Sequence, residues 1–407
     1  MQLAKFMRPA FLMLAVVLSL TFAQAQTYKV LYAFQGSSDG AFPLGVIVDS
    51  AGNLYGTTPA DVGEGGYYGS VYEITSAGQF VLLHSFTSDQ IPSGSTPFAT
   101  LARDPSGNLY GTTFYGGTDG AGVVFRLDVN NTYSVLYNFA ARWGSPMGWG
   151  PIGSLALDLQ GNLYGAGPGG KASCNNGSCG MVFKLDPSGN LTMLRGFTKG
   201  KGGIYPNAGL IRDASGNLFG TTSRGGNKGG HGVVFKLDPT GKETALYTFA
   251  KKPDANSPQF GLVQDAAGNF YGTTQLGGLK GCPDGLGPLT CGTVFKIDPS
   301  GNETILYRFT GKADGGNPYG PLVIDKAGNL YGTAGWGANR YGVIFKVDPS
   351  GNESVLFAFP ADSSLGLGPQ GGLAMDSLGN FYGTTYTGGD LNECDGYGCG
   401  VVFELTP

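Results

Sequence analysis

The sequence predicts an all-β fold, a seven-bladed β-propeller of four-stranded antiparallel blades. Three observations lead to this prediction. A short phrase, fullest at residues 107–113 as Gly-Asn-Leu-Tyr-Gly-Thr-Thr, occurs in seven copies. Four short β-rich segments accompany the copies, and the two ends of the expected mature chain supply complementary parts of one repeat unit.

The repeat period is long. The central aromatic residues of the seven copies are separated, by subtraction, by 55, 54, 55, 52, 60 and 51 residues. A period of this length indicates repeated supersecondary units rather than a coiled coil. The central residues are Tyr55, Tyr110, Tyr164, Phe219, Tyr271, Tyr331 and Tyr382.

Each unit contains four segments with the composition of β-strands. In the sixth unit they are residues 320–324, 329–333, 343–347 and 355–359, rich in Val, Ile, Leu, Tyr and Phe. Four strands per repeat form one blade of a propeller.

Two tight turns join the strands within a unit. The pattern Asp-x-x-Gly-Asn, as in residues 325–329, joins the first two strands, and Asp-Pro-Ser-Gly-Asn, as in residues 348–352, joins the last two. Asp caps such a turn, and Gly takes its left-handed position. The first turn would place seven aspartates in a ring on one face, where turn capping is favoured over calcium binding: Asp49, Asp104, Asp158, Asp213, Asp265, Asp325 and Asp376.

The two ends of the mature chain predict how the ring closes. The chain begins with a fourth-type strand at residues 28–34 and ends with a third-type strand at residues 401–405. The N-terminal strand can therefore complete the last blade, which removes two free sheet edges. An open solenoid is disfavoured because the end repeats lack polar caps.

Residues 1–25 have the pattern of a secretory signal peptide. Lys5 and Arg8 precede an apolar stretch at residues 11–22, and Ala-Gln-Ala at residues 23–25 fits a cleavage site. The apolar stretch is too short to favour a membrane span. We therefore expect a signal peptide at 1–25, one propeller domain at 26–407, no membrane insertion, no anchor after Pro407, and a secreted location, periplasmic or extracellular.

Six cysteines suit an oxidising compartment. They form three local pairs, each in the loop between strands two and three of one unit, and we expect a disulfide within each loop. Zinc is the alternative, but no nearby histidine supports it. The pairs are Cys174 with Cys179, Cys282 with Cys291, and Cys394 with Cys399.

Composition narrows the range of partners. The net charge is −4 and only 13% of residues are charged, so the chain lacks the basic surface that nucleic acids require. We expect no nucleic-acid partner, no cofactor, no metal site and a monomeric protein.

The candidate site lies on the face that carries the long loops. Loops between strands two and three, and between blades, emerge on the same face, and function is often carried by loops on a rigid scaffold. Aromatic rings with arginine suit a glycan or a peptide, although the rings could instead pack the glycine-rich loops together. The candidates are Arg142, Trp143 and Trp149 in one inter-blade loop, Tyr67 and Tyr68 in the first blade, Phe114 and Tyr115 in the second, and Trp336, Arg340 and Tyr341 in the sixth.

The axis of the propeller is expected to be lined by small uncharged residues. Four positions before each turn aspartate stand Gly45, Thr100, Ser154, Gly209, Gly261, Pro321 and Gly372. Such a lining does not supply the acid and base of a catalytic channel. The two histidines, His84 and His231, lie in an outer strand and at a loop end, so neither a triad nor a histidine metal site is expected, and we assign no catalytic residue.

These observations favour a secreted binding propeller with a glycan, peptide or protein ligand on the loop-rich face. One alternative is a carbohydrate-active enzyme, a lyase or hydrolase, that uses two loop carboxylates. Another is a structural extracellular repeat protein. The carboxylate candidates are Asp61, Glu64, Asp119, Asp284, Asp390 and Glu393.

The repeated phrases also carry a family resemblance. The heptapeptide above, residues 232–239 (Gly-Val-Val-Phe-Lys-Leu-Asp-Pro) and residues 305–309 (Ile-Leu-Tyr-Arg-Phe) resemble the GloVer tandem repeats of bacterial "choice-of-anchor" surface proteins. The resemblance covers essentially the whole mature chain. It implies an exported bacterial repeat protein, and it supplies no catalytic residues to transfer.

Overall fold

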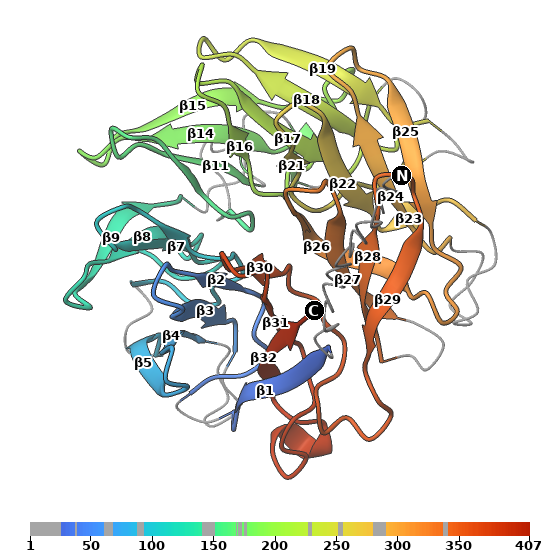
Figure 1. Cartoon of the computed structure of the whole chain (residues 1–407). Coiled ribbons are helices and arrows are strands. Elements are labelled where there is room, and N and C mark those ends of the chain that lie inside the picture. Colours follow the sequence, from blue (N-terminus) through green and yellow to red (C-terminus); the bar gives the residue numbers. More distant parts are fainter. Residues whose placement is uncertain are drawn as a thin grey trace, which may run out of the picture.

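The strands form seven four-stranded antiparallel sheets arranged around a central axis (Figure 1). This architecture confirms the seven-bladed propeller. The computed structural model describes residues 26–36, 39–60, 68–87, 93–140, 151–167, 169, 173–174, 177–226, 230–250, 255–279, 290–336 and 341–407. The expected signal peptide, residues 1–25, lies outside this range.

Blades are numbered I to VII in the order of their first strands, and each runs outward from the axis. Blade I is β2 (Val46–Val48), β3 (Leu54–Thr58), β4 (Ser70–Ile74) and β5 (Phe80–Ser85); blade II is β6 (Ala102–Arg103), β7 (Leu109–Thr112), β8 (Val123–Leu127) and β9 (Tyr133–Asn138); blade III is β10 (Ala156–Leu157), β11 (Leu163–Gly167), β14 (Met181–Leu185) and β15 (Leu191–Gly196); blade IV is β16 (Ile211–Arg212), β17 (Leu218–Thr222), β18 (Val233–Leu237) and β19 (Glu243–Thr248). Blade V is β21 (Val263–Gln264), β22 (Phe270–Thr274), β24 (Thr293–Ile297) and β25 (Glu303–Arg308); blade VI is β26 (Gly316–Ile324), β27 (Leu330–Trp336), β28 (Val343–Val347) and β29 (Glu353–Ala358); blade VII is β30 (Ala374–Met375), β31 (Phe381–Thr385), β32 (Val401–Thr406) and β1 (Thr27–Ala33).

The ring closes through the two ends of the described chain, as the sequence predicts. Strand β1 pairs antiparallel with β32, from Thr27 opposite Thr406 to Ala33 opposite Val401. Figure 1 shows the blue first strand beside the red last strand. Blade VII is therefore built from both ends of the propeller.

The hydrophobic core lies between neighbouring blades. In blade V, the ring of Phe295 on β24 covers Gly272 on β22, and a Cβ at Gly272 would lie 2.7 Å from the Phe295 Cζ atom. Phe295 is fully buried in a cluster that also contains Phe219 of blade IV. Glycine in the repeated Gly-Asn-Leu-Tyr-Gly phrase thus lets an aromatic ring approach the sheet closely.

The ring of turn aspartates serves to cap turns, which confirms the favoured interpretation. Asp104 Oδ1 accepts the backbone N–H of Asn108 at 2.9 Å, and Oδ2 accepts Asn108 Nδ2 at 2.7 Å and the Tyr110 hydroxyl at 3.1 Å. Partial burial would raise the pKa of Asp104, but the hydrogen bonds from Asn108 and Tyr110 hold it below its usual value. The turn and the second strand therefore share one hydrogen-bonded unit.

In six of the seven blades, a described residue-proline pair joins the blade to the preceding one. Phe42 adopts a left-handed backbone with φ of 63°, and its N–H donates to the Cys399 carbonyl at 2.8 Å. The following Pro43 is buried against Gly400, where a Cβ would lie 2.7 Å from the proline Cδ. The same left-handed conformation precedes a proline at Thr96, Tyr205, Ser257, Asn317 and Gly368.

Two features of the strands were not expected from the sequence. The short hairpin of β12 (Ser173–Cys174) with β13 (Gly177–Ser178) adds to the loop-rich face. So does the antiparallel pair of β20 (Ala255–Asn256) with β23 (Leu276–Gly277), which stand before and after the first two strands of blade V. Strand β26 begins at Gly316, four residues before the expected start, because its bulged register continues the pairing with β27 as far as Trp336. Within the described residues, no helix is both long and apolar enough to cross a membrane.

Candidate functional site

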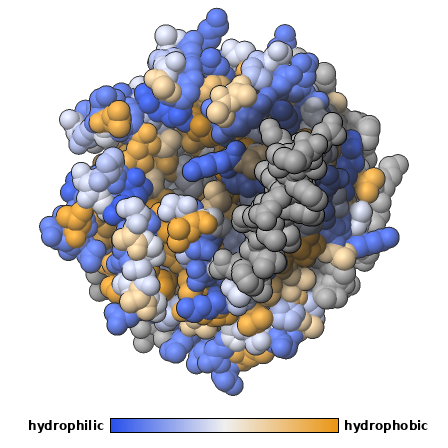
Figure 2. Space-filling model, viewed as in Figure 1, coloured by the Kyte–Doolittle hydropathy of each residue, from blue (hydrophilic) through white to orange (hydrophobic). Residues whose placement is uncertain are grey.

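A cavity of about 550 Å³ lies on the propeller axis at the loop-rich end. Its lining comes from the starts of the innermost strands, which follow the inter-blade loops, and from Phe114, which follows β7. Figure 2 shows one face of the molecule, on which hydrophobic residues appear between hydrophilic ones rather than as one continuous patch.

Seven residues in equivalent places form a ring in this cavity, because each follows the buried proline of its blade. Blades I to III contribute apolar side chains to the ring, and blades IV to VII contribute amides and one phenol. The ring is Leu44, Phe98, Ile152, Asn207, Gln259, Tyr319 and Gln370. One half of the cavity is therefore apolar, and the other half can donate and accept hydrogen bonds.

The wall next to this ring matches the small axial residues expected from the sequence. Six of the seven expected positions line the cavity: Thr100, Ser154, Gly209, Gly261, Pro321 and Gly372. Gly45 is not among the lining residues. Small side chains here leave the volume that the larger ring residues surround.

Aromatic rings lie on two sides of the cavity. Phe98, which is 42% exposed, makes an edge-to-face contact with Phe114 at a centroid distance of 6.0 Å. Phe114 in turn contacts Tyr115 at 4.6 Å. Across the axis, Phe260 and Tyr319 have centroids 5.2 Å apart. The exposed ring faces are available for stacking with a ligand.

The sequence candidates have different positions in the structure. Phe114 lines the cavity, and Tyr115 lies beside it with 46% of its surface exposed. Trp336 ends β27, and its backbone pairs with Gly316. The remaining candidates of this kind, Tyr67, Arg142, Trp143, Trp149 and Arg340, lie outside the described residues.

Tyr68 and Tyr341 occupy equivalent places and serve in packing. Each is half-buried against an inter-blade core. Their carbonyls accept hydrogen bonds from the next blade, from the N–H of Thr96 at 2.8 Å and of Gly368 at 3.0 Å. These contacts are of the kind that the packing alternative expects, and ligand contact by the two tyrosines stays a prediction.

A second, polar cavity of about 610 Å³ adjoins the first between blades IV and V. The two cavities share Asn207 and Gln259. Gln259 Nε2 donates to Gln275 Oε1 at 2.7 Å, and Gln275 Nε2 donates to the Tyr319 hydroxyl at 3.2 Å. The polar lining also includes Tyr205, Ser223, Arg224, Asn256 and Ser257.

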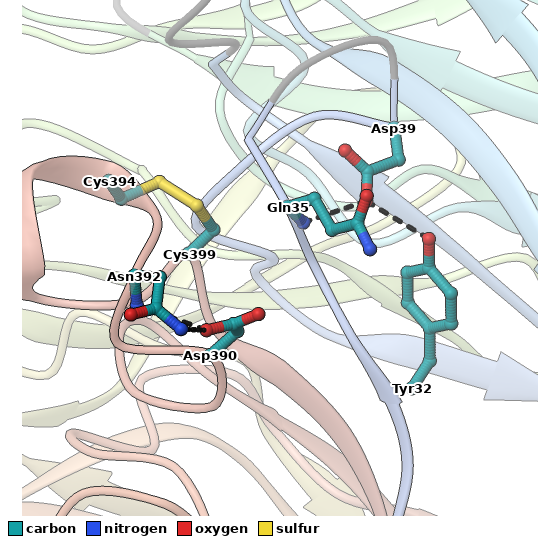
Figure 3. The surroundings of a disulfide bond; sticks show 7 residues. All are labelled: Tyr32, Gln35, Asp39, Asp390, Asn392, Cys394 and Cys399. Carbon is teal, nitrogen blue, oxygen red and sulfur yellow. Dashed lines mark hydrogen bonds between the residues drawn. A yellow bond between two sulfur atoms is a disulfide. The ribbon is translucent and has the colours of Figure 1, made fainter.

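The disulfides lie at the bases of the loops on this face. Cys174–Cys179 and Cys394–Cys399 are formed, which confirms two of the expected pairs. Figure 3 shows the second, with Asp390 and Asn392 on the same loop. Cys291 is also disulfide-bonded, and Cys282 lies outside the described residues.

The described loop carboxylates and histidines have local structural surroundings. Asp119 is exposed, and Asp390 Oδ1 accepts hydrogen bonds from the N–H and Nδ2 of Asn392 at 3.0 and 2.9 Å. His84 stacks on Tyr133 with centroids 4.0 Å apart, and burial lowers its pKa to about 4. Among described residues, no group of three metal-binding side chains comes together. Asp61, Glu64 and Asp284 lie outside that part of the chain.

Sequence reasoning did not find the ring residues that follow the prolines. Their signal was present in the sequence, because each stands directly after a proline. That proline precedes the turn aspartate of its blade by six residues in blade I and by seven residues in the other blades. Unlike the turn residues, they differ from blade to blade. Variation at a structurally equivalent position marks a place that the fold does not constrain.

Three solved structures of low sequence identity are among those that match the chain. PorZ, a surface component of the type-IX secretion system of Porphyromonas gingivalis, is 14% identical with a TM-score of 0.51; the match covers 93% of this chain and 48% of PorZ. A gluconolactonase from Xanthomonas campestris is 14% identical over 75% of this chain and 85% of its own, with a TM-score of 0.44. A luciferin-regenerating enzyme is 12% identical over 94% and 95% of the two chains, with a TM-score of 0.45.

At such identity the likeness to PorZ concerns the fold alone, and this chain spans about half of its length. No curated protein matches the sequence. The model of the Gloeobacter/Verrucomicrobia repeat matches three times, at residues 15–178, 105–285 and 231–407. The matches together span nearly the whole chain and follow the repeated blades, so the protein belongs to the Gloeobacter/Verrucomicrobia repeat family.

Proposed function

We propose that the protein binds carbohydrate, without catalysis, in the axial cavity of its loop-rich face. The observation that carries this proposal is the divided ring, in which Leu44, Phe98 and Ile152 face the amides of Asn207, Gln259 and Gln370 around one cavity. Ligand sites are typically concave and largely apolar, with a few polar groups that fix orientation.

The chemistry of a sugar suits both halves of this ring. One face of a pyranose carries C–H groups that stack on aromatic rings, and Phe98 and Phe114 offer such rings. The hydroxyl groups at the edge of a sugar both donate and accept hydrogen bonds, as do the side-chain amides of Asn207 and Gln259. A cavity of about 550 Å³ has the size of small-molecule sites.

The positions of the described acids favour binding over acid–base chemistry. Asp390 and Glu393 belong to the loop of blade VII and do not line the axial cavity, and Asp119 is an exposed residue of the blade II loop. The disulfides support a role outside the cytoplasm, because such bonds persist in oxidising compartments.

Isothermal titration calorimetry of the purified protein against a panel of neutral and acidic oligosaccharides tests this proposal. We expect saturable binding to at least one member, weakened about tenfold or more in Phe98→Ala, which removes a stacking surface. The matched control is Tyr397→Ala, which removes an aromatic ring that is 70% exposed on the loop of blade VII and does not line the cavity. Binding to no member of the panel, or equal loss in both variants, contradicts the proposal.

A further inference from the structure

Arg224 introduces a positive charge into the polar cavity between blades IV and V. The ion pairs of the described residues involve other arginines, namely Arg103 with Asp49, Arg126 with Asp128 and Arg195 with Glu243. The described lining of this cavity is otherwise neutral, made of amides, hydroxyls, backbone and the side chain of Leu276. A cation in such a lining attracts a ligand with a negative charge.

The backbone holds Arg224 in a defined place. Its N–H donates to the Ile204 carbonyl at 3.2 Å, and its carbonyl accepts the Ile204 N–H at 2.7 Å. The adjacent Ser223 hydroxyl donates to the Tyr205 carbonyl at 3.3 Å. The base of the arginine is therefore pre-organised, and only its side chain has to settle on a ligand.

The charge is specific to blade IV. In three other blades the same bridge, between the segment before the first strand and the segment after the second, has another residue in place of Arg224: Ala60 in blade I, Tyr115 in blade II and Thr387 in blade VII. An arginine here is thus not required by the fold, which accepts a methyl group, a phenol or a hydroxyl at the equivalent place.

We infer that the Arg224 cavity binds the carboxylate of a uronate, an acidic sugar residue, within an oligosaccharide whose neighbouring ring occupies the axial cavity. This inference rests on the proposed function. The guanidinium matches a carboxylate with two parallel hydrogen bonds. Asn207 and Gln259 border both cavities, so one chain of two or more sugars can contact both. Sugar hydroxyls suit the surrounding amides better than the apolar side chains of a peptide would.

The test compares acidic oligosaccharides with their uncharged counterparts. The probes are oligogalacturonates, oligoglucuronates and oligomannuronates of two to four residues, each paired with the same oligosaccharide after reduction of its carboxylates to alcohols. Calorimetry measures the dissociation constants for the purified full-length protein. We expect at least one acidic member to bind about 10- to 100-fold more tightly than its reduced counterpart, as for a hydrogen bond to a charged group.

Two variants locate the effect. Arg224→Gln should remove the preference for the acid while leaving binding of the reduced oligosaccharide unchanged, and Arg224→Lys should restore it only in part, because lysine lacks the planar fork. The control is Arg308→Gln, at the end of β25 and outside both cavities. It should change neither the preference for the acid nor the binding of the reduced oligosaccharide.

The outcomes separate the two proposals. If no sugar binds, both fail. If reduced and acidic forms bind equally, or if Arg224→Gln leaves the preference intact, the carbohydrate proposal stands and the uronate inference is wrong. Equally tight displacement of the oligouronate by a short acidic peptide would show that the cavity recognises charge alone, which also overturns the inference.

Discussion

The backbone N–H of Phe42 donates a 2.8 Å hydrogen bond to the carbonyl oxygen of Cys399. This bond joins blade I to blade VII at the point where the chain closes its ring. Cys179 and Cys291 make the same contact with the next blade, through the N–H of Tyr205 and of Asn317, each at 2.8 Å. In all three blades a cysteine thus stands where the loop meets its neighbour.

The disulfide at Cys399 should therefore stabilise the closing blade. We expect Cys394→Ala with Cys399→Ala to lower the free energy of unfolding by about 2 kcal/mol, the value the chain-entropy model gives for so short a loop. Chemical denaturation followed by circular dichroism measures the change. Cys174→Ala with Cys179→Ala is the matched variant. Its expected loss is the same, because the sequence separation is five residues in both pairs. A denaturation curve identical to that of the wild type would refute this role.

Much of the fold could be predicted from the sequence, because it depends on geometry within single blades. The turn aspartates, the strand-two glycines and the complementary chain ends are dictated by local geometry that every blade shares, so they predicted seven blades and their closure. The two extra strand pairs and the early start of β26 depend on contacts between loops. Such contacts have no fixed sequence pattern and could not be derived in advance.

The candidate site was only partly predictable for a related reason. The loop aromatic residues selected from the sequence include Phe114, which lines the axial cavity. They also include Tyr68 and Tyr341, which are half-buried against inter-blade cores. The ring residues such as Asn207 and Gln259 are common polar types within the repeat itself. Their convergence depends on the closed ring, which brings residues from seven blades to one axis.

The close contact between Gly272, on the second strand of blade V, and the Phe295 ring can be tested by substitution. Gly272→Ala should lower the free energy of unfolding by about 1–3 kcal/mol, because the new methyl group would overlap the Phe295 ring and the Leu262 side chain. Gly200→Ala is the control, since a Cβ there meets nothing within 4 Å and its backbone does not require glycine. That variant should be neutral or slightly more stable. Equal effects of the two changes on the unfolding midpoint would disprove the packing argument.

We expect Glu353 to make the stability of the propeller depend on pH near neutrality. Burial, and secondarily the charge of Asp314, raise the pKa of Glu353 to about 7, from an ordinary value of 4.5. Its neighbour Tyr307 donates its hydroxyl to Asp314 Oδ2 at 2.9 Å. Glu353 thus begins β29 beside an acidic, hydrogen-bonded group of the preceding blade.

The sign of the effect follows from proton binding. Between pH 4.5 and 7 the folded protein retains the Glu353 proton and the unfolded chain does not, so this residue makes the free energy of unfolding fall as the pH rises through that range. Because Glu353 is only half-buried, we expect a loss of about 1 kcal/mol after solvent screening.

Glu353→Gln should remove this loss and be more stable than the wild type at pH 8. Glu243→Gln, at the equivalent position of blade IV but paired with Arg195 at 2.7 Å, should retain it. Denaturation midpoints measured from pH 4 to 8 decide the matter, and a Glu353→Gln profile parallel to that of the wild type would rule it out.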